Sequence, residues 1–233
     1  MPTAPRPAPA TSLTERRKAA TQLEIARTAA ALFAERGTPA DGTGTAGTPG
    51  PVTAEEIARA SGVALRTFYR YFRTKEDAVA PLLAMGVRQW LADLERLADD
   101  TERLPVREAL EHTARRSLTP VDERAAEALR WTRGLLRAMR TDPALRAVWH
   151  RAHHESEEAL IPVLTRMTTA DPMAVRLAAA AANTAMRVAV ETWAEWEPPT
   201  TPEGAAAPEP NPADLVVHAL RALMAGLPEL DRR

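Results

Sequence analysis

The sequence VTAEEIARASGVALRTFYRYFRTKE, residues 52–76, decides the fold of this protein. Thr53 and Glu56 have the spacing of a capping box, which predicts that a short helix begins at this point. Gly62 follows this helix and supplies a turn, after which a second helix is predicted over residues 64–71. Two short helices joined by a glycine-containing turn have the geometry of a helix-turn-helix.

The predicted second helix carries side chains that suit the major groove of DNA. Arg66 and Arg70 can each donate two hydrogen bonds to guanine, and Thr67 can contact a thymine methyl group or a phosphate. Tyrosine hydroxyls and a lysine at a helix N-terminus are typical phosphate contacts, which position a protein on DNA without reading its sequence. The pattern therefore predicts that this helix enters the major groove.

Residues 52–63 and 67–76 resemble the DNA-binding segment of the TetR/AcrR family of transcriptional regulators, and LFAERG at residues 32–37 resembles that family's first helix. The resemblance implies a homodimer that binds a palindromic operator in double-stranded DNA. It also implies a set of DNA contacts. Phosphates are contacted by Thr53 and by Tyr69, Arg70 and Tyr71, bases by Leu65, Arg66, Thr67 and Arg70, and the DNA backbone by Lys75.

Two features depart from the family pattern. Ala64 stands where the family has serine, so the helix predicted over residues 64–71 loses a side-chain N-cap worth about 1 kcal/mol. The helix that ends at Gly37 and the helix that begins after Thr53 are joined by residues 38–51, a long Gly- and Pro-rich loop that is expected to be flexible. Lengthening a loop costs only about 0.6 kcal/mol per doubling, so the fold is expected to survive this insertion. Whether the loop touches DNA is left open.

Composition favours an all-α protein of about nine helices, three before Thr74 and six after. Aromatic residues make up only 4% of the chain, and the abundant Ala, Leu, Glu and Arg all favour helix. Residues 1–76 hold 11 basic and 7 acidic residues, whereas the remainder holds 19 and 24. The net positive charge of the N-terminal part therefore favours contact with phosphates, and the net negative charge of the C-terminal part does not. The expected organisation is a disordered tail (1–12), a DNA-binding domain (13–75) and a regulatory and dimerisation domain (76–233).

Several helix boundaries are marked by capping residues. Ser12 and Glu15 form a capping box at the start of the first long helix. Four later helices are predicted to begin at a capping residue followed by proline, because proline fits the first helical position. These pairs are Thr119-Pro120, Asp142-Pro143, Asp171-Pro172 and Asn211-Pro212. Pro81 and Pro162 fall inside predicted helices and are expected to kink or break them.

Two helices of the back half are candidates for dimerisation. The helix from residue 172 to about 196 is rich in small residues, and the last helix has an apolar stripe at spacings of four, seven, eight and eleven. The resemblance implies that these helices pair with their mates in a four-helix bundle. The predicted contacts are Ala178, Ala182, Ala185, Ala189, Val216, Leu220, Leu223, Met224 and Leu227. In the alternative, both stripes face the core of their own protomer.

A ligand pocket is expected among the middle helices, where large and adaptable apolar side chains gather. The candidate lining residues are Trp90, Trp131, Met139, Trp149, Met167 and Met186, although such residues are more often plain core. Residues 129–147 and the helix that ends at Trp196 are similar to the C-terminal domain of family members that bind acyl-CoA-like ligands.

His150, His153 and His154 lie near Glu157 at spacings that zinc sites use. An exposed polar helix face is the preferred interpretation, and no metal or other cofactor is predicted.

The resulting hypothesis is a repressor that a small-molecule ligand releases from its operator. One alternative is a DNA-binding regulator that is controlled by a protein partner or acts as an activator. Another is a helical ligand-binding or enzymatic protein that does not bind DNA, but no nucleophile–base pair or phosphate-binding loop supports catalysis. The chain has no cysteine, no signal peptide and no apolar run long enough to span a membrane, so a cytoplasmic location is expected.

Overall fold

The computed structural model describes residues 12–37, 50–100, 104–197, 208–227 and 230, and these residues form an all-α fold without strands. Its α-helices are α1 (Leu13–Gly37), α2 (Ala54–Ala60), α3 (Leu65–Tyr71), α4 (Ala80–Asp99), α5 (Val106–Ser117), α6 (Glu123–Ala138), α7 (Pro143–Met167), α8 (Pro172–Glu195) and α9 (Pro212–Met224). A 3-10 turn, Glu76–Val79, precedes α4. The predicted all-α class and the division into three helices before Thr74 and six after are confirmed in this part of the chain. Residues 1–11 of the predicted tail and nearly all of the 38–51 loop lie outside the described residues.

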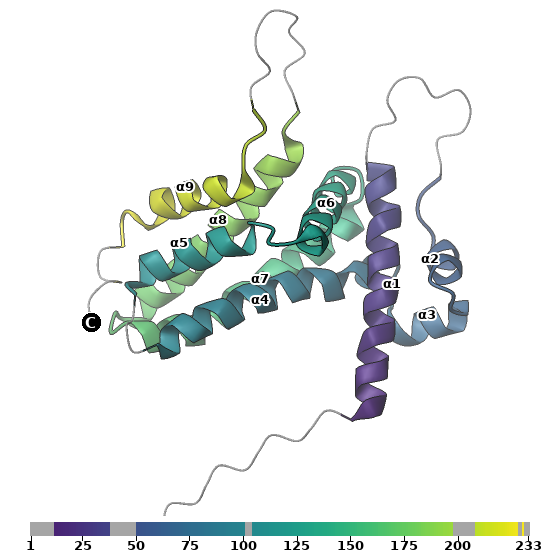
Figure 1. Cartoon of the computed structure of the whole chain (residues 1–233), viewed down its shortest axis with the longest axis horizontal. Coiled ribbons are helices and arrows are strands. Elements are labelled where there is room, and N and C mark those ends of the chain that lie inside the picture. The colour runs from purple at the N-terminus through teal and green to yellow at the C-terminus, as the bar shows by residue number, and fades with distance from the viewer. Residues whose placement is uncertain (1–11, 38–49, 101–103, 198–207, 228–229, 231–233) are drawn as a thin grey trace, which may run out of the picture.

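Helix α1 stands between the short α2–α3 pair and the remaining helices (Figure 1). On one side it contacts α2, and on the other it packs along α6 and touches α4. The other helices form a bundle in which α8 packs against both α7 and α9, and α5 packs against α4 and α9. Helix α1 therefore belongs to both halves of the molecule.

Most of the helix starts follow the capping signals. The Ser12 hydroxyl accepts from the backbone N–H of Glu15, whose carboxylate accepts from the N–H of Ser12. Helices α7, α8 and α9 begin with proline after Asp142, Asp171 and Asn211, as the sequence predicts.

The prediction at Thr119-Pro120 was wrong. Helix α6 begins at Glu123, because the Asp122 carboxylate accepts from the N–H of Ala125 at 2.7 Å. The Thr119 hydroxyl instead donates to the carbonyl of Arg115 at the end of α5.

The structure differs from the prediction at Pro81, and at Pro162 it excludes a break in the helix. Pro81 lies in the first turn of α4, where its missing N–H costs no hydrogen bond. Pro162 lies inside α7, but the helix continues through it to Met167 and is not broken. No helix among the described residues is both long and apolar enough to cross a membrane.

Candidate DNA-binding surface and internal cavity

The α2–turn–α3 unit is held together by a small apolar core. Ile57 of α2 and Phe68 of α3 are fully buried, and Phe72 is nearly so. The turn between the helices requires Gly62, whose φ of 69° lies in the left-handed region that side chains rarely adopt. The next N–H, that of Val63, donates back to the carbonyl of Ala58 at 2.9 Å. These contacts fix the angle between the two helices and so determine which side of α3 faces outward.

The outward side of α3 is basic and aromatic. Arg66, Tyr69 and Arg70 are exposed, with Tyr69 accessible over 52% of its surface. Leu65, Thr67 and Tyr71 are partly buried, and the Arg70 guanidinium lies 5.1 Å from the centre of the Tyr71 ring. All six were predicted DNA contacts, and the structure brings them together on one short helix.

Thr53 and Lys75, the other two predicted contacts, lie outside α3. The exposed Thr53 caps α2, with its hydroxyl accepting from the N–H of Glu56 at 3.2 Å. Lys75 is partly buried, 3.2 Å from Glu76 and above the ring of Phe33 in α1. Its position ties the end of the helix-turn-helix to α1. Arg73 is also exposed just beyond α3 and was not selected from the sequence, although it continues the same basic stretch.

An ion pair between Arg36 and Glu56 joins α1 to α2. Both side chains are mostly shielded from solvent, so screening by salt weakens this pair less than an exposed one. The helix-turn-helix is thus fastened to α1 at α2 and again beyond α3.

Residues 49–80 match the family model described as bacterial regulatory proteins, tetR family. This chain carries a TetR-family DNA-binding segment. Together with the all-α fold, this segment supports a DNA-binding transcriptional regulator.

Solved TetR-family structures share the fold. Thermus thermophilus FadR, a TetR-family repressor solved in complex with lauroyl-CoA, is 23% identical with a TM-score of 0.51, and the match covers 88% of this chain and 94% of that one. The TetR-family repressor AlkX from Dietzia sp. strain DQ12-45-1b, implicated in the biodegradation of n-alkanes, is 17% identical with a TM-score of 0.50, covering 90% and 98%. No curated protein matches the chain.

The second candidate site is a cavity of about 580 Å³ in the TetR-like helical bundle, lined by residues of α4, α5, α6, α7 and α8 and by Arg27 of α1. Of the residues predicted to line a pocket, Trp90, Trp131, Trp149 and Met186 do so. Met139 and Met167 are not among the lining residues; Met139 is buried at the end of α6, and Met167 packs against the core at the end of α7. The apolar wall also contains residues that were not predicted, among them Trp193 and Leu135.

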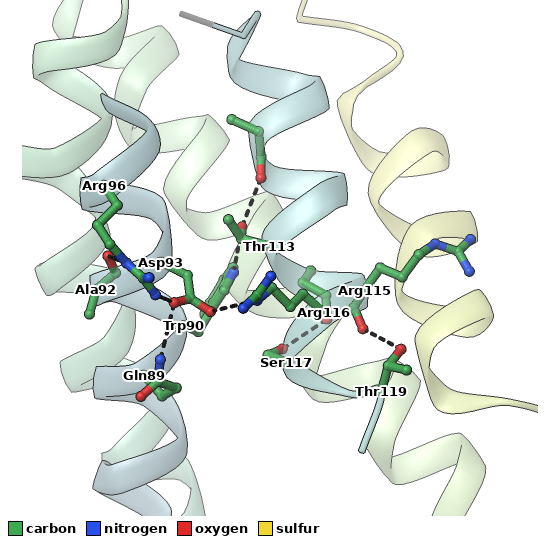
Figure 2. Close-up of polar contacts among 12 residues, drawn as sticks. Gln89, Trp90, Ala92, Asp93, Arg96, Thr113, Arg115, Arg116, Ser117 and Thr119 are labelled. Carbon is green, nitrogen blue, oxygen red and sulfur yellow. Dashed lines mark hydrogen bonds and ion pairs between the residues drawn. The ribbon is translucent and has the colours of Figure 1, made fainter. Parts of the chain in front are cut away.

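Three of the lining tryptophans use their N–H groups within the protein. Figure 2 shows the Trp90 N–H donating to the Thr113 hydroxyl, next to the buried Asp93, which pairs with Arg96 and Arg116. The Trp149 N–H donates to Glu191, and that of Trp193 to Glu209. Because these indole N–H groups are satisfied elsewhere, the rings offer the cavity mainly apolar surface.

The histidines considered for zinc do not converge, and the exposed polar face expected for all three was wrong for His153. His150 and His154 are exposed, whereas His153 is buried and its Nδ1 lies 3.0 Å from the Asn183 side chain. Among the described residues no group of His, Asp or Glu side chains is arranged to hold a metal ion. Burial is the main cause that lowers the pKa of His153 to about 4.

The predicted dimerisation residues are mostly inside the protomer. Seven of them are buried in the protomer's own core, Leu227 is partly buried and Leu223 is exposed. The buried seven are Ala178, Ala182, Ala185, Ala189, Val216, Leu220 and Met224. The outer face of α8 is instead lined by Met173, Leu177 and Val188, all exposed and apolar.

Proposed function

We propose that this protein is a homodimeric repressor whose operator binding is relieved by an apolar small molecule held in the cavity of the helical bundle. The observation that supports this most strongly is that the cavity wall includes α6 and Arg27 of α1, while α1 also carries the helix-turn-helix. One helix therefore touches both the candidate ligand site and the candidate DNA-binding surface.

Operator reading is assigned to the exposed side of α3. Arg66 and Arg70 are exposed there and can reach base edges, and Tyr69 can donate its hydroxyl to a phosphate. The neighbouring Arg73 and Thr53 add phosphate contacts on either side. Of the two glutamates of α2, Glu56 is paired with Arg36, which offsets its charge.

Coupling between ligand and DNA is assigned to two connections. Helix α6 packs along α1, so a ligand that displaces α6 also displaces the support of the helix-turn-helix. Arg151 of α7 pairs with Asp77 at 2.7 Å, which ties another cavity-lining helix to the turn that follows the helix-turn-helix. A ligand acts through these connections only if it binds the DNA-competent and released states with different affinity.

Dimerisation is assigned to the outer faces of α8 and α9. Met173, Leu177 and Val188 follow one face of α8, with Ala181 and Thr184 between them at helical spacing. Leu223 is exposed on α9, which packs beside α8. A two-fold symmetric dimer that presents two such α3 helices fits a palindromic operator whose half-sites lie one DNA turn apart.

The proposed ligand is a molecule with a long apolar part. The cavity is lined largely by Leu, Val, Met and Trp side chains, and its volume suits a small organic molecule. FadR was solved with lauroyl-CoA, and AlkX is implicated in n-alkane biodegradation. Both descriptions involve an unbranched hydrocarbon chain, which this lining would accommodate.

The proposed function is tested by fluorescence anisotropy with the intergenic DNA upstream of the protein's own gene, titrated across salt concentrations. The wild type is expected to bind a palindromic segment tightly, and Arg66→Ala to bind it about 10-fold or more weakly, since a base contact is worth about 1–3 kcal/mol. Arg88→Ala removes another exposed arginine, from α4, and should bind as the wild type does. Equal binding of all three proteins to every duplex would contradict operator recognition by α3.

Release is tested by adding lauroyl-CoA to the same complex. The anisotropy is expected to fall in proportion to occupancy of the cavity. Binding of lauroyl-CoA to the free protein without any fall in anisotropy would contradict ligand-controlled release.

A further inference from the structure

Two polar side chains of α7 interrupt the apolar wall of the cavity. His153 and Ser156 both line it, although they expose only 6% and 1% of their surfaces to solvent. Residues three apart on a helix share a face, so the two groups lie next to each other. Burying a polar group is energetically unfavourable unless the group is hydrogen-bonded, so the hydrogen bonds of both side chains matter.

The hydrogen bonds of His153 determine what its ring offers the cavity. The Asn183 amide nitrogen donates to Glu157 at 3.4 Å, which turns the amide oxygen toward His153. That oxygen lies 3.0 Å from Nδ1 of His153, so Nδ1 carries the proton and donates. Burial lowers the pKa of His153 to about 4, and the ring is therefore neutral near pH 7. Its Nε2 then presents a lone pair, which accepts hydrogen bonds and cannot donate them.

Ser156 contributes a hydrogen-bond donor, which complements the acceptor on His153. Its hydroxyl is buried and has no hydrogen-bond partner. The other hydroxyls of the cavity wall are already satisfied, because Ser117 donates to the carbonyl of Ala114 at 2.8 Å and Thr132 to that of Ala128 at 2.9 Å. A buried hydroxyl without a partner is energetically unfavourable, and a ligand that accepts a hydrogen bond from it would remove part of that penalty.

A carboxylate is disfavoured at this point of the wall. Glu191 and Arg187 both act on His153 electrostatically, and they pair with each other at 2.8 Å. The arginines that line the cavity, Arg27 and Arg124, belong to α1 and α6 and not to α7. A carboxylate placed against Nε2 would therefore meet a lone pair rather than a donor.

We propose that His153 and Ser156 form a specificity site for an uncharged polar group, such as an alcohol, that donates to His153 Nε2 and accepts from Ser156 Oγ. The ligand class is then an apolar molecule bearing one neutral hydroxyl or amide rather than a hydrocarbon or a fatty acid anion. The inference rests on the proposed function in taking the cavity as the ligand site, and it specifies the chemistry of that ligand.

The test uses three probes with the same ten-carbon chain: 1-decanol, which donates and accepts, decyl methyl ether, which only accepts, and decanoate, which is charged. Affinities are measured by tryptophan fluorescence, since Trp90, Trp131, Trp149 and Trp193 line the cavity. The wild type is expected to bind 1-decanol about 5-fold more tightly than the ether, because one hydrogen bond contributes about 1 kcal/mol. Decanoate is expected to bind most weakly.

Two variants separate the roles of the pair. His153→Phe keeps an aromatic ring beside Trp149 but removes the acceptor, so 1-decanol should lose its advantage over the ether. Ser156→Ala removes the donor and should weaken both neutral probes by a similar factor. Ser117→Ala is the matched control, since it deletes a cavity hydroxyl that is already bonded, and it should leave the affinities unchanged. Thermal unfolding without ligand checks the fold, and Ser156→Ala is expected to be at least as stable as the wild type.

Equal affinities of the wild type for 1-decanol and the ether, unchanged binding by Ser156→Ala, or preference for decanoate would each overturn the inference. In those cases the probes still bind, and the proposed function stands. Failure of all three probes to bind would overturn the inference together with the cavity's part in the proposed function. Loss of operator recognition in the anisotropy experiment would overturn the proposed function alone, because the probe titrations contain no DNA.

Discussion

Gly134 of α6 lies so close to Ala34 of α1 that a Cβ atom built on the glycine would be 2.8 Å from the Ala34 Cα and closer still to its Cβ. Real Cβ atoms do not approach other carbon atoms this closely, so only glycine permits the two helices to pack at this distance. The absence of a side chain at position 134 therefore sets the spacing between the helix-turn-helix support and the cavity wall.

Gly134→Ala is expected to destabilise the protein by about 1–3 kcal/mol, because the backbone of α1 must move away from α6. At about 2–4 °C per kcal/mol, circular dichroism should detect the fall in Tm. Gly86→Ala is the control, since position 86 is inside α4 with no atom within 4 Å of its Cβ. That change should be neutral or stabilising, and a Tm for Gly134→Ala at or above that of Gly86→Ala would contradict the close-packing argument.

Ala64→Ser is expected to stabilise α3. Ala64 has extended backbone angles (φ −67°, ψ 146°) and makes no side-chain cap hydrogen bond, so a serine hydroxyl at this position can accept from an N–H of the first turn. The gain should be about 1 kcal/mol, measured by urea unfolding. Ala60→Ser, at the exposed end of α2, offers no such N-cap and should not stabilise. Equal effects of the two substitutions would show that capping is not the cause.

The stability of the protein is expected to depend on pH through His153. Its pKa is about 4 in the folded state, below the ordinary value of 6.5, mainly because of burial. Between these values the unfolded chain binds a proton that the folded protein does not, so stability is fully present above pH 6.5 and is lost as pH falls toward 4. The loss should reach about 2 kcal/mol at pH 5.

Urea unfolding of the wild type and His153→Phe at pH 7 and pH 5 measures this contribution. The variant should lose less stability than the wild type between the two pH values. His154→Gln, a change at an exposed neighbour, should retain the wild-type pH dependence. Parallel losses in all three proteins would mean that other groups cause the acid sensitivity.

Leu177→Glu combined with Val188→Glu is expected to dissociate the proposed dimer. Both side chains are exposed on the outer face of α8, and four buried carboxylates at a symmetric interface would be poorly solvated. Analytical ultracentrifugation should then report a monomer. Val121→Glu, at an exposed apolar residue before α6, should leave the mass unchanged. A dimer that survives the double substitution would place the interface elsewhere.

Local signals in the sequence predicted the elements well. The capping box at Thr53 and the glycine of the turn depend only on neighbouring residues, and the structure contains both. The start of α6 was misplaced because Thr119 and Asp122 both offer a cap, and the sequence does not show which carboxyl or hydroxyl finds a free N–H.

Long-range relationships were harder to predict. Helical periodicity identified the apolar stripes of α8 and α9 but not their partners, and most of those residues pack in the protomer's own core. Four of the six candidate pocket residues do line the cavity. Arg27 and Ser156 were missed, since their significance lies in contacts with helices far along the chain.

The dual contacts of α1 bear on how such proteins could be recombined. A chimera joined at residue 75 would carry Arg27 and Ala34 along with the N-terminal part of the chain. Both residues would then pack against the C-terminal bundle of another protein. The boundary between the helix-turn-helix and the C-terminal bundle instead runs lengthwise along α1, between the side that contacts α2 and the side that contacts α6. Exchange of specificities would therefore require grafting one face of a helix rather than cutting the chain at a single position.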